Sequence, residues 1–219
     1  MFASSVSTME EEQKKLTTLR LINPVLASNL MRNYTEMVTA ATEGKVHDIL
    51  KLVQTSQGPP PIWFKVKMFR ESVLNLRLGV MKFMVEQGFE VESIFEPLKD
   101  LLFVLIERNK KDSDRSLERD KLYAQVMMFL VVKCRMNVHH FRKGDKNRLT
   151  PIHIAAREGL VYMCLLLGKV GADVNSVGMG DEMPLTLAID AKHDACVKVL
   201  LKMGAKQTWR KDVKQITPW

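Results

Sequence analysis

The 219-residue sequence has few turn-forming residues, few cysteines and no long apolar run. With 11 glycines and 8 prolines it lacks the turns that a many-stranded β protein of this length needs, so we predict a mostly helical chain. Three widely spaced cysteines do not suit a disulfide framework and favour a reducing compartment. No apolar run approaches about 18 residues, and no basic segment leads into an apolar stretch at the N-terminus, so we expect neither a transmembrane helix nor a secretory signal.

Charge and hydrophobicity place the chain among globular proteins. Hydrophobic residues make up 46% and charged residues 26%, which excludes wholesale disorder and a collagen-like structure. Lysine and arginine number 33 against 25 aspartate and glutamate, for a net charge of +8. This excess predicts a preference for acidic partners without saying of which kind.

Proline recurs at an almost constant interval in the C-terminal third. Pro184 follows Pro151 by 33 residues, and Pro218 follows Pro184 by 34. The surrounding letters recur as well: T-P-I-H-I-A-A, then M-P-L-T-L-A, then T-P-W. Between the prolines, Gly204 follows Gly171 by 33 residues. One shared period of this length predicts stacked copies of a small structural unit.

Residues 150–175 resemble the ankyrin repeat, whose pattern reads T-P-[LI]-H-x-A-A-x-x-G, an amphipathic helix and then G-A-D-V-N. Thr150 can cap a helix whose first turn accepts Pro151. Gly159 and Gly171 stand where the chain leaves each helix, which are positions that favour a positive φ. The resemblance implies an all-α solenoid of stacked helix-turn-helix pairs with short β-hairpin fingers, which works by binding other proteins.

The N-terminal half contains weaker copies of the same pattern. They include A-A-T-E-G at residues 40–44, G-F-E-V at residues 88–91, and a third copy that starts near residue 96 and in which Arg135 is the counterpart of Gly171. We therefore predict an ankyrin-repeat domain of about five repeats over residues 33–219, with the last repeat truncated from residue 217. We expect residues 1–32 to form an N-terminal capping segment of one or two helices, broken near Asn23-Pro24; the alternative is a helix that binds a partner.

The third copy is longer than the others. Pro97 to Arg135 spans 38 residues, whereas Pro151 to Gly171 spans 20. The surplus falls in residues 107–121, which are dense in charges of both signs, and we interpret them as a solvated loop or a helix extension between the two helices of that repeat. Ser113 and Ser116 within it are candidate phosphorylation sites.

No local pattern indicates catalysis. Cys134, His139 and His140 lack the paired spacing of zinc ligands. His153 stands at the family position where the resemblance implies structural hydrogen bonds. The glycines of residues 178–180 match neither phosphate-binding motif and indicate a hairpin tip. We therefore predict a protein that is not an enzyme, without catalytic residues, cofactor, metal or small-molecule substrate.

Basic residues concentrate in the segments before Pro151 and Pro218. The first group comprises Lys133, Arg135, Arg142, Lys143, Lys146 and Arg148, and the second comprises Lys206, Arg210, Lys211 and Lys214. The finger between them carries two acids. From the resemblance, the fingers form the recognition surface, and the predicted partner-binding residues are Arg142, Lys143, Lys146, Arg148, Asp181 and Glu182.

An acidic protein segment is favoured as the ligand over DNA or RNA. The two acids interrupt the basic stripe, and only Phe141 and Trp209 supply aromatic rings among its charges. We predict an intracellular adaptor or scaffold, cytoplasmic with the nucleus as a second compartment. The alternatives are an inhibitor that resembles the inhibitor-of-NF-κB group, against which the positive charge counts, and a regulatory subunit of an enzyme complex.

Overall fold

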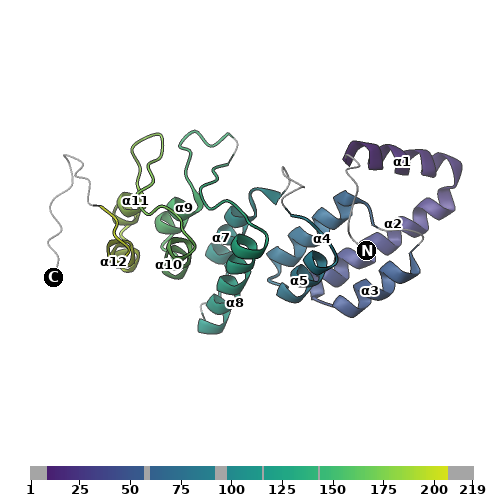
Figure 1. The fold of residues 1–219 in the computed structure, drawn as a ribbon, viewed down its shortest axis with the longest axis horizontal. Helices are drawn as coiled ribbons and strands as arrows, with labels where there is room; N and C mark the ends of the chain where they lie inside the picture. The colour runs from purple at the N-terminus through teal and green to yellow at the C-terminus, as the bar shows by residue number, and fades with distance from the viewer. Residues whose placement is uncertain (1–8, 57–59, 92–97, 115, 143, 207–219) are drawn as a thin grey trace. The chain divides into compact units, whose positions relative to one another are not determined.

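We describe residues 9–56, 60–91, 98–114, 116–142 and 144–206 of a computed structural model of the chain (Figure 1). These residues form eleven α-helices and one short π-helix, and none of them lies in a β-strand. The all-α prediction is confirmed. The finger loops, which we expected as β-hairpins, consist of turns and irregular backbone over their described residues.

The chain divides into two compact units. Unit 1 comprises residues Met1–Asn137 and unit 2 comprises residues Val138–Trp219. The helices of unit 1 are α1 (Met9–Ile22), α2 (Pro24–Glu43), α3 (Val46–Thr55), α4 (Ile62–Leu74), α5 (Leu78–Glu86), α7 (Leu101–Lys111), α8 (Leu117–Met128) and the π-helix η1 (Phe129–Lys133). The helices of unit 2 are α9 (Pro151–Arg157), α10 (Val161–Lys169), α11 (Pro184–Asp190) and α12 (Asp194–Lys202).

Consecutive helices pack as pairs in both units. In unit 1, α2 contacts α3, α4 contacts α5, and α7 contacts α8; in unit 2, α9 contacts α10, and α11 contacts α12. Successive pairs stack through like helices, because α2 contacts α4, α4 contacts α7, and α9 contacts α11. Such stacking buries apolar faces that one pair cannot cover alone.

A left-handed residue leads into the second helix of four of the described pairs. These residues are Gly44, Leu76, Gly159 and Lys192, with φ of 87°, 55°, 72° and 59°. The predicted positive φ of Gly159 is confirmed. The turn itself is held by one recurring backbone bond, shown by Arg77 N to Ser72 O at 2.7 Å and His193 N to Ala188 O at 2.9 Å. Two of the four turns therefore form without glycine.

A second left-handed residue follows the second helix. Gly88, Arg135, Gly171 and Gly204 occupy this position with φ of 85°, 50°, 95° and 88°. The structure thus confirms Arg135 as the counterpart of Gly171, although an arginine in this conformation is strained where a glycine is not.

The π-helix η1 places one extra residue at the end of α8. Its final backbone bond joins Met136 N to Leu130 O, across six residues, whereas the equivalent bond from Ala172 N to Leu167 O crosses five. A π-turn of this kind forms when a helix accommodates one extra residue by widening a single turn. Part of the surplus length in the third copy is therefore taken up here.

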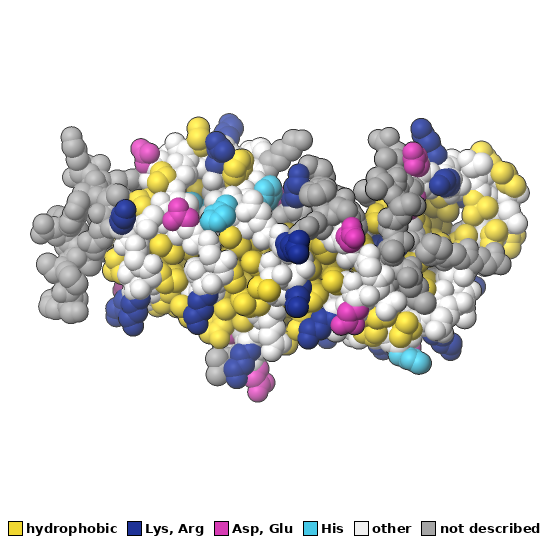
Figure 2. Space-filling model, viewed as in Figure 1, with side chains coloured by type: hydrophobic (Ala, Val, Ile, Leu, Met, Phe, Trp, Pro, Cys, Tyr) yellow, Lys and Arg dark blue, Asp and Glu magenta, His cyan; other side chains and the backbone are white. Residues whose placement is uncertain are grey.

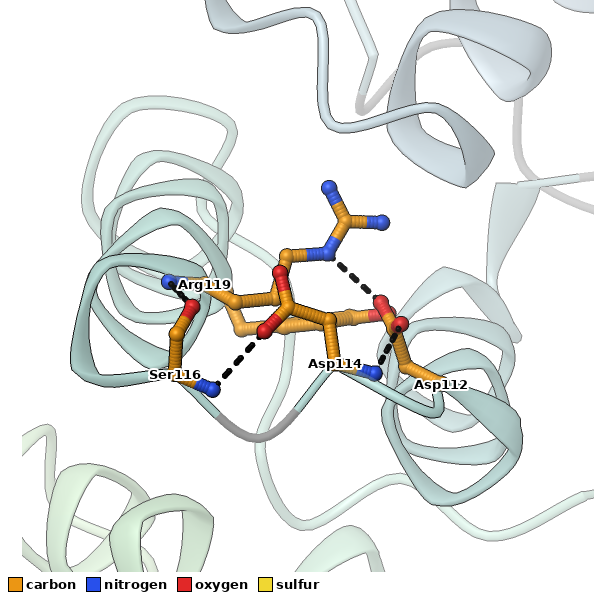
Figure 3. A network of polar contacts seen from close by, with 5 residues as sticks. Asp112, Asp114, Ser116 and Arg119 are labelled. Carbon is orange, nitrogen blue, oxygen red and sulfur yellow. Dashed lines mark hydrogen bonds and ion pairs between the residues drawn. The ribbon is translucent and has the colours of Figure 1, made fainter.

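The rest of the surplus extends α7 and α8, as one of our two interpretations predicted. Figure 3 shows the short connection between them. Asp112 accepts hydrogen bonds from Arg119 Nε at 2.6 Å and Tyr123 Oη at 2.9 Å, and Ser116 Oγ accepts from Arg119 N at 3.2 Å as the N-cap of α8. The segment is not fully solvated, because Asn109 within it is buried.

The N-terminal helices are joined where the sequence predicted a break. Helix α1 ends at Ile22 and α2 begins at Pro24, with Asn23 Oδ1 accepting a hydrogen bond from Leu26 N at 3.0 Å. Helix α2 runs on through residues 32 and 33 to Glu43. Glu12 joins α1 to α4, because its Oε2 accepts from Ile62 N at 2.5 Å.

Candidate protein-interaction site

Two finger loops of unit 2 form the candidate site. Finger 1 comprises residues 138–150 and finger 2 comprises residues 172–183; in Figure 1 they rise side by side from the helix ends near α9 and α11. The backbone joins them, since Met179 N donates to Asn147 O at 2.8 Å. Gly178 N donates to Glu182 O at 2.8 Å and closes the tip of finger 2. The two loops therefore present one connected surface.

Asp145 sets the shape of finger 1. Its carboxylate accepts from Asn147 N at 3.1 Å and from Leu149 N at 3.0 Å. Arg148 between them has a φ of 51°, and the Leu149 side chain is buried. A side-chain acceptor thus replaces the strand pairing expected of a hairpin.

His153 fixes both fingers to the start of α9. The Thr150 backbone N–H donates to its Nδ1 at 3.2 Å, so Nε2 carries the proton and donates to Ser176 O at 3.0 Å and Glu182 O at 3.2 Å. Burial lowers the pKa of His153, and the bonds to the two carbonyls oppose this shift. A neutral, fully buried imidazole with every nitrogen bonded is structural, as the resemblance implied.

The predicted binding residues occupy different places on these fingers. Lys146 and Asp181 are exposed, Arg142 is half-buried, and Lys143 lies outside the described residues. Arg148 is an exposed residue, and its guanidinium carbon lies 4.2 Å from the centre of the Phe141 ring.

Glu182, the sixth predicted residue, supports finger 2 from within. Its carboxylate accepts a hydrogen bond from Gly180 N at 2.8 Å, and its backbone oxygen accepts the bond that closes the tip. Asp181 beside it has a φ of 58°, so the tip turns at this pair.

Sequence reasoning named Phe141 in this surface but missed the exposed Val177 and Met179. Phe141 is 37% exposed, Val177 58% and Met179 66%. With Lys146 and Arg148 these side chains form what we call the finger patch, and Figure 2 shows hydrophobic and charged side chains together along the edge above α9 and α11. The sequence did contain a signal for this apolar surface, because Val177 and Met179 flank Gly178 in a loop tip that would ordinarily be polar.

The described residues were also searched for metal and membrane features. No three His, Cys, Asp or Glu side chains of the described ranges gather as metal ligands. No described helix combines the length and apolar character that crossing a bilayer requires. Cys134, Cys164 and Cys196 are buried and form no disulfide.

Comparison with protein families identifies the repeat. A model of ankyrin repeats, in three copies, matches residues 120–212. This chain contains ankyrin repeats. The matched residues span α8 to α12 and include both fingers. Ankyrin repeats are generally protein–protein interaction modules, and the family is typically non-catalytic.

Proposed function

We propose that this ankyrin-repeat protein is an adaptor or scaffold that binds an acidic segment of a partner protein through its finger patch. The observation that carries the proposal is an exposed apolar cluster within a basic rim on loops that are internally braced. Arginine, methionine and aromatic side chains are the residues enriched at the centres of protein interfaces. Braced loops lose little conformational entropy on binding.

The charges of the fingers support an acidic partner. Arg142, Lys146 and Arg148 lie on finger 1, and Asp181 is exposed on finger 2. Complementary charges at an interface rim speed association and set the orientation of the partner. A segment whose acids face finger 1 and whose one basic residue faces Asp181 fits this pattern. The same acid makes the surface a poor track for a nucleic-acid backbone.

We prefer the adaptor role to that of an inhibitor that covers the basic surface of a transcription factor, because such an inhibitor needs an acidic binding face. A regulatory subunit of an enzyme complex would use the same patch, and the identity of the partner separates the two roles. We propose that the protein has no catalytic activity and acts in the cytoplasm or nucleus, a location that suits three buried cysteines without a disulfide.

The test is quantitative affinity capture from cells with matched charge reversals. The finger variant carries Arg142→Glu, Lys146→Glu and Arg148→Glu. The control variant carries Lys169→Glu, Lys198→Glu and Lys202→Glu, three exposed residues of α10 and α12 in the same unit. We expect the control to retain the partners that the finger variant loses by about tenfold or more.

Two results contradict the proposal. Recovery of the same proteins by the finger variant and the wild type shows that the patch is not the binding surface. Recovery of RNA or DNA that is released at moderate salt supports the nucleic-acid alternative. An added pair of changes, Val177→Ser and Met179→Ser, tests the apolar part separately, since it leaves every charge in place.

A further inference from the structure

The joint between α1 and α2 carries the most exposed apolar side chains in the part of the chain that the structure describes. Leu21 is 82% exposed, Ile22 76% and Val25 69%, more than any other large hydrophobic side chain in those ranges. They surround the helix break at Asn23. In Figure 2, hydrophobic side chains gather at the end of unit 1 where Figure 1 shows α1 turning into α2. We call Leu21, Ile22 and Val25 the apolar tip.

Positive charge surrounds the apolar tip. Residues 13–35 contain no aspartate or glutamate, and their four basic residues, which give this stretch a net charge of +4, are Lys14, Lys15, Arg20 and Arg32. All four are exposed. On α1 the two lysines lie seven residues before the two tip residues of that helix, and on α2 Arg32 lies seven residues after Val25. Three cations therefore lie about 10 Å from the tip along their helices.

The first acids on either side of this basic stretch are Glu12 and Glu36, and neither neutralises it. The Glu12 carboxylate accepts a hydrogen bond from Ile62 N and so belongs to the contact between α1 and α4. Arg32 Nε lies 4.0 Å from Glu36 Oε1, with side chains that are 69% and 53% exposed. Because an exposed ion pair of this length contributes little stability, Arg32 is available to an anionic ligand.

The backbone of the joint exposes few polar groups. A helix N-terminus has four N–H groups without a partner inside the helix, and such groups are costly in an apolar environment. Here Asn23 N donates to Leu19 O at 2.8 Å, and Leu26 N donates to Asn23 Oδ1 at 3.0 Å. Pro24, the first residue of α2, has no N–H at all. Three of the four positions are thus satisfied, which lowers the cost of placing this joint in an apolar environment.

The shape and composition of the apolar tip favour a lipid surface over a macromolecular partner. Three aliphatic side chains are too few for a stable interface between two copies, which buries about 1,200 Å² or more. They also have no ring on which the bases of a nucleic acid could stack. A protruding side chain needs a matching pocket in a protein partner, whereas lipid chains adapt to it. An apolar tip in a basic stretch is complementary to a membrane surface that carries anionic lipids.

We propose that the joint between α1 and α2 is a membrane-contact site for anionic lipids. With the joint pointing toward the bilayer, the apolar tip enters the boundary between headgroups and acyl chains to a depth of about 5–10 Å. Lys14, Lys15 and Arg32 then lie at the level of the anionic headgroups, and Arg20 extends its side chain back toward them. The contact is superficial and needs no membrane-spanning helix. It lies in unit 1 and does not depend on the finger patch of unit 2.

The test is co-sedimentation of the full chain with lipid vesicles. Vesicles of phosphatidylcholine with about 30% phosphatidylserine are compared with vesicles of phosphatidylcholine alone, and we expect the chain to bind the anionic vesicles at least about tenfold more strongly. A second measurement locates the contact. Ile22→Cys, labelled with an environment-sensitive fluorophore, should show a blue shift with anionic vesicles, and Thr39→Cys, an exposed residue further along α2, should show none. Selective labelling is feasible because the three native cysteines are buried.

One variant removes the apolar contribution and leaves every charge in place. It carries Leu21→Ser, Ile22→Ser and Val25→Ser. Its matched control replaces three exposed apolar residues of α8 and η1, also in unit 1, and carries Leu122→Ser, Met128→Ser and Val132→Ser. We expect the tip variant to lose at least about tenfold in vesicle binding and the control to retain it.

A second variant removes the charges and leaves the apolar tip in place. It carries Lys14→Gln, Lys15→Gln and Arg32→Gln. Its matched control neutralises three other exposed lysines of unit 1 and carries Lys51→Gln, Lys67→Gln and Lys82→Gln. We expect the charge variant to lose at least about tenfold in binding to anionic vesicles and the control to retain it.

Several results overturn the proposal. They are equal binding to the two kinds of vesicle, full binding by either variant, and an unchanged fluorophore signal at Ile22→Cys. If the tip variant does not fold, the charge variant and the labelled Ile22→Cys chain decide. Binding of a protein or a nucleic acid to the joint without binding of vesicles assigns the site to that partner and also overturns the proposal.

Discussion

Unit 2 and unit 1 build the same turns from different residues. In unit 2, the ring of His193 donates from Nε2 to Arg157 O at 3.1 Å, next to the left-handed Gly159. In unit 1, Arg77 Nε donates to Thr42 O at 2.9 Å, next to the left-handed Gly44. Both donors are the N-cap residue of a second helix and reach the preceding pair.

The comparison shows what the repeat requires. The His193 ring and the Arg77 guanidinium each donate to the carbonyl at the same position of their turn. Leu76 and Lys192 adopt the left-handed conformation that glycine has in the other two turns. The repeat therefore requires a hydrogen-bonded carbonyl and a left-handed residue in this turn. The residues of the ankyrin pattern are one way to meet these two requirements. Substitutions in both units test the residues that hold these structures.

The largest expected effect is that of His153→Ala. The change removes the bonds that the ring makes with Thr150 N and Ser176 O in a buried place, and one of the two that Glu182 O accepts. We expect unit 2 to lose about 3–5 kcal/mol of its free energy of unfolding. Segment-resolved hydrogen exchange measures this loss separately in each unit. His193→Ala, which removes one partly exposed bond, should have a smaller effect; equal effects would show that His153 has no special role.

The next effect concerns one turn position in two successive repeats. Gly159→Ala places a β-carbon 2.7 Å from His193 Nδ1 at a φ of 72°, and we expect about 2 kcal/mol of destabilisation. Lys192→Gly relieves a positive φ on an exposed residue and should stabilise by about 0.5–1 kcal/mol. Chemical denaturation followed by circular dichroism measures both. Effects of the same sign would contradict the proposed equivalence of the two turns.

Asp112→Asn tests the bracing of the extension in unit 1. The change weakens the bonds from Arg119 and Tyr123 to a carboxylate that is 12% exposed, and we expect a local loss of about 1–2 kcal/mol. Faster hydrogen exchange in the first turn of α8 is the measurement. Glu118→Gln, an exposed neighbour, is the control, and matching exchange rates in the two variants would show that the network contributes nothing.

The smallest effect is a difference in acid sensitivity between the units. Because burial lowers the pKa of His153, unit 2 keeps the full contribution of this group above about pH 6.5 and loses it as the pH falls further. Burial would raise the pKa of Asp112, but bonds from Arg119 and Tyr123 lower it, so its contribution is lost only below about pH 4. Lowering the pH from 7 to 5 should therefore weaken unit 2 before unit 1, and hydrogen exchange at the two pH values measures the stability of each unit. His153→Ala should remove this difference in acid sensitivity between the units.

The sequence predicted those features that depend on short residue patterns. Thr150 is the N-cap of α9 and Pro151 its first residue, as expected, and the break at Asn23 is confirmed. Leu76 and Lys192 could not be predicted as turn residues, because their positive φ is imposed by packing and backbone bonds instead of by the side chain.

Other features had no local signal. The π-helix depends on how one extra residue is accommodated, and the letters F-L-V-V-K at residues 129–133 read as an ordinary helix. The exposure of Val177 and Met179 depends on the direction in which each side chain leaves the loop. Trp209, Arg210, Lys211 and Lys214, together with the predicted truncated repeat from residue 217, lie outside the described residues.

The bracing of the fingers divides their residues into two classes. Asp145, His153 and Glu182 determine the loop conformation through bonds within the protein, and Val177 and Met179 expose their side chains to solvent. Substitutions of the second class change the contact chemistry without changing the backbone. The finger surface can therefore be redesigned for new binding specificities, or diversified in a library, while the repeat that carries it stays folded.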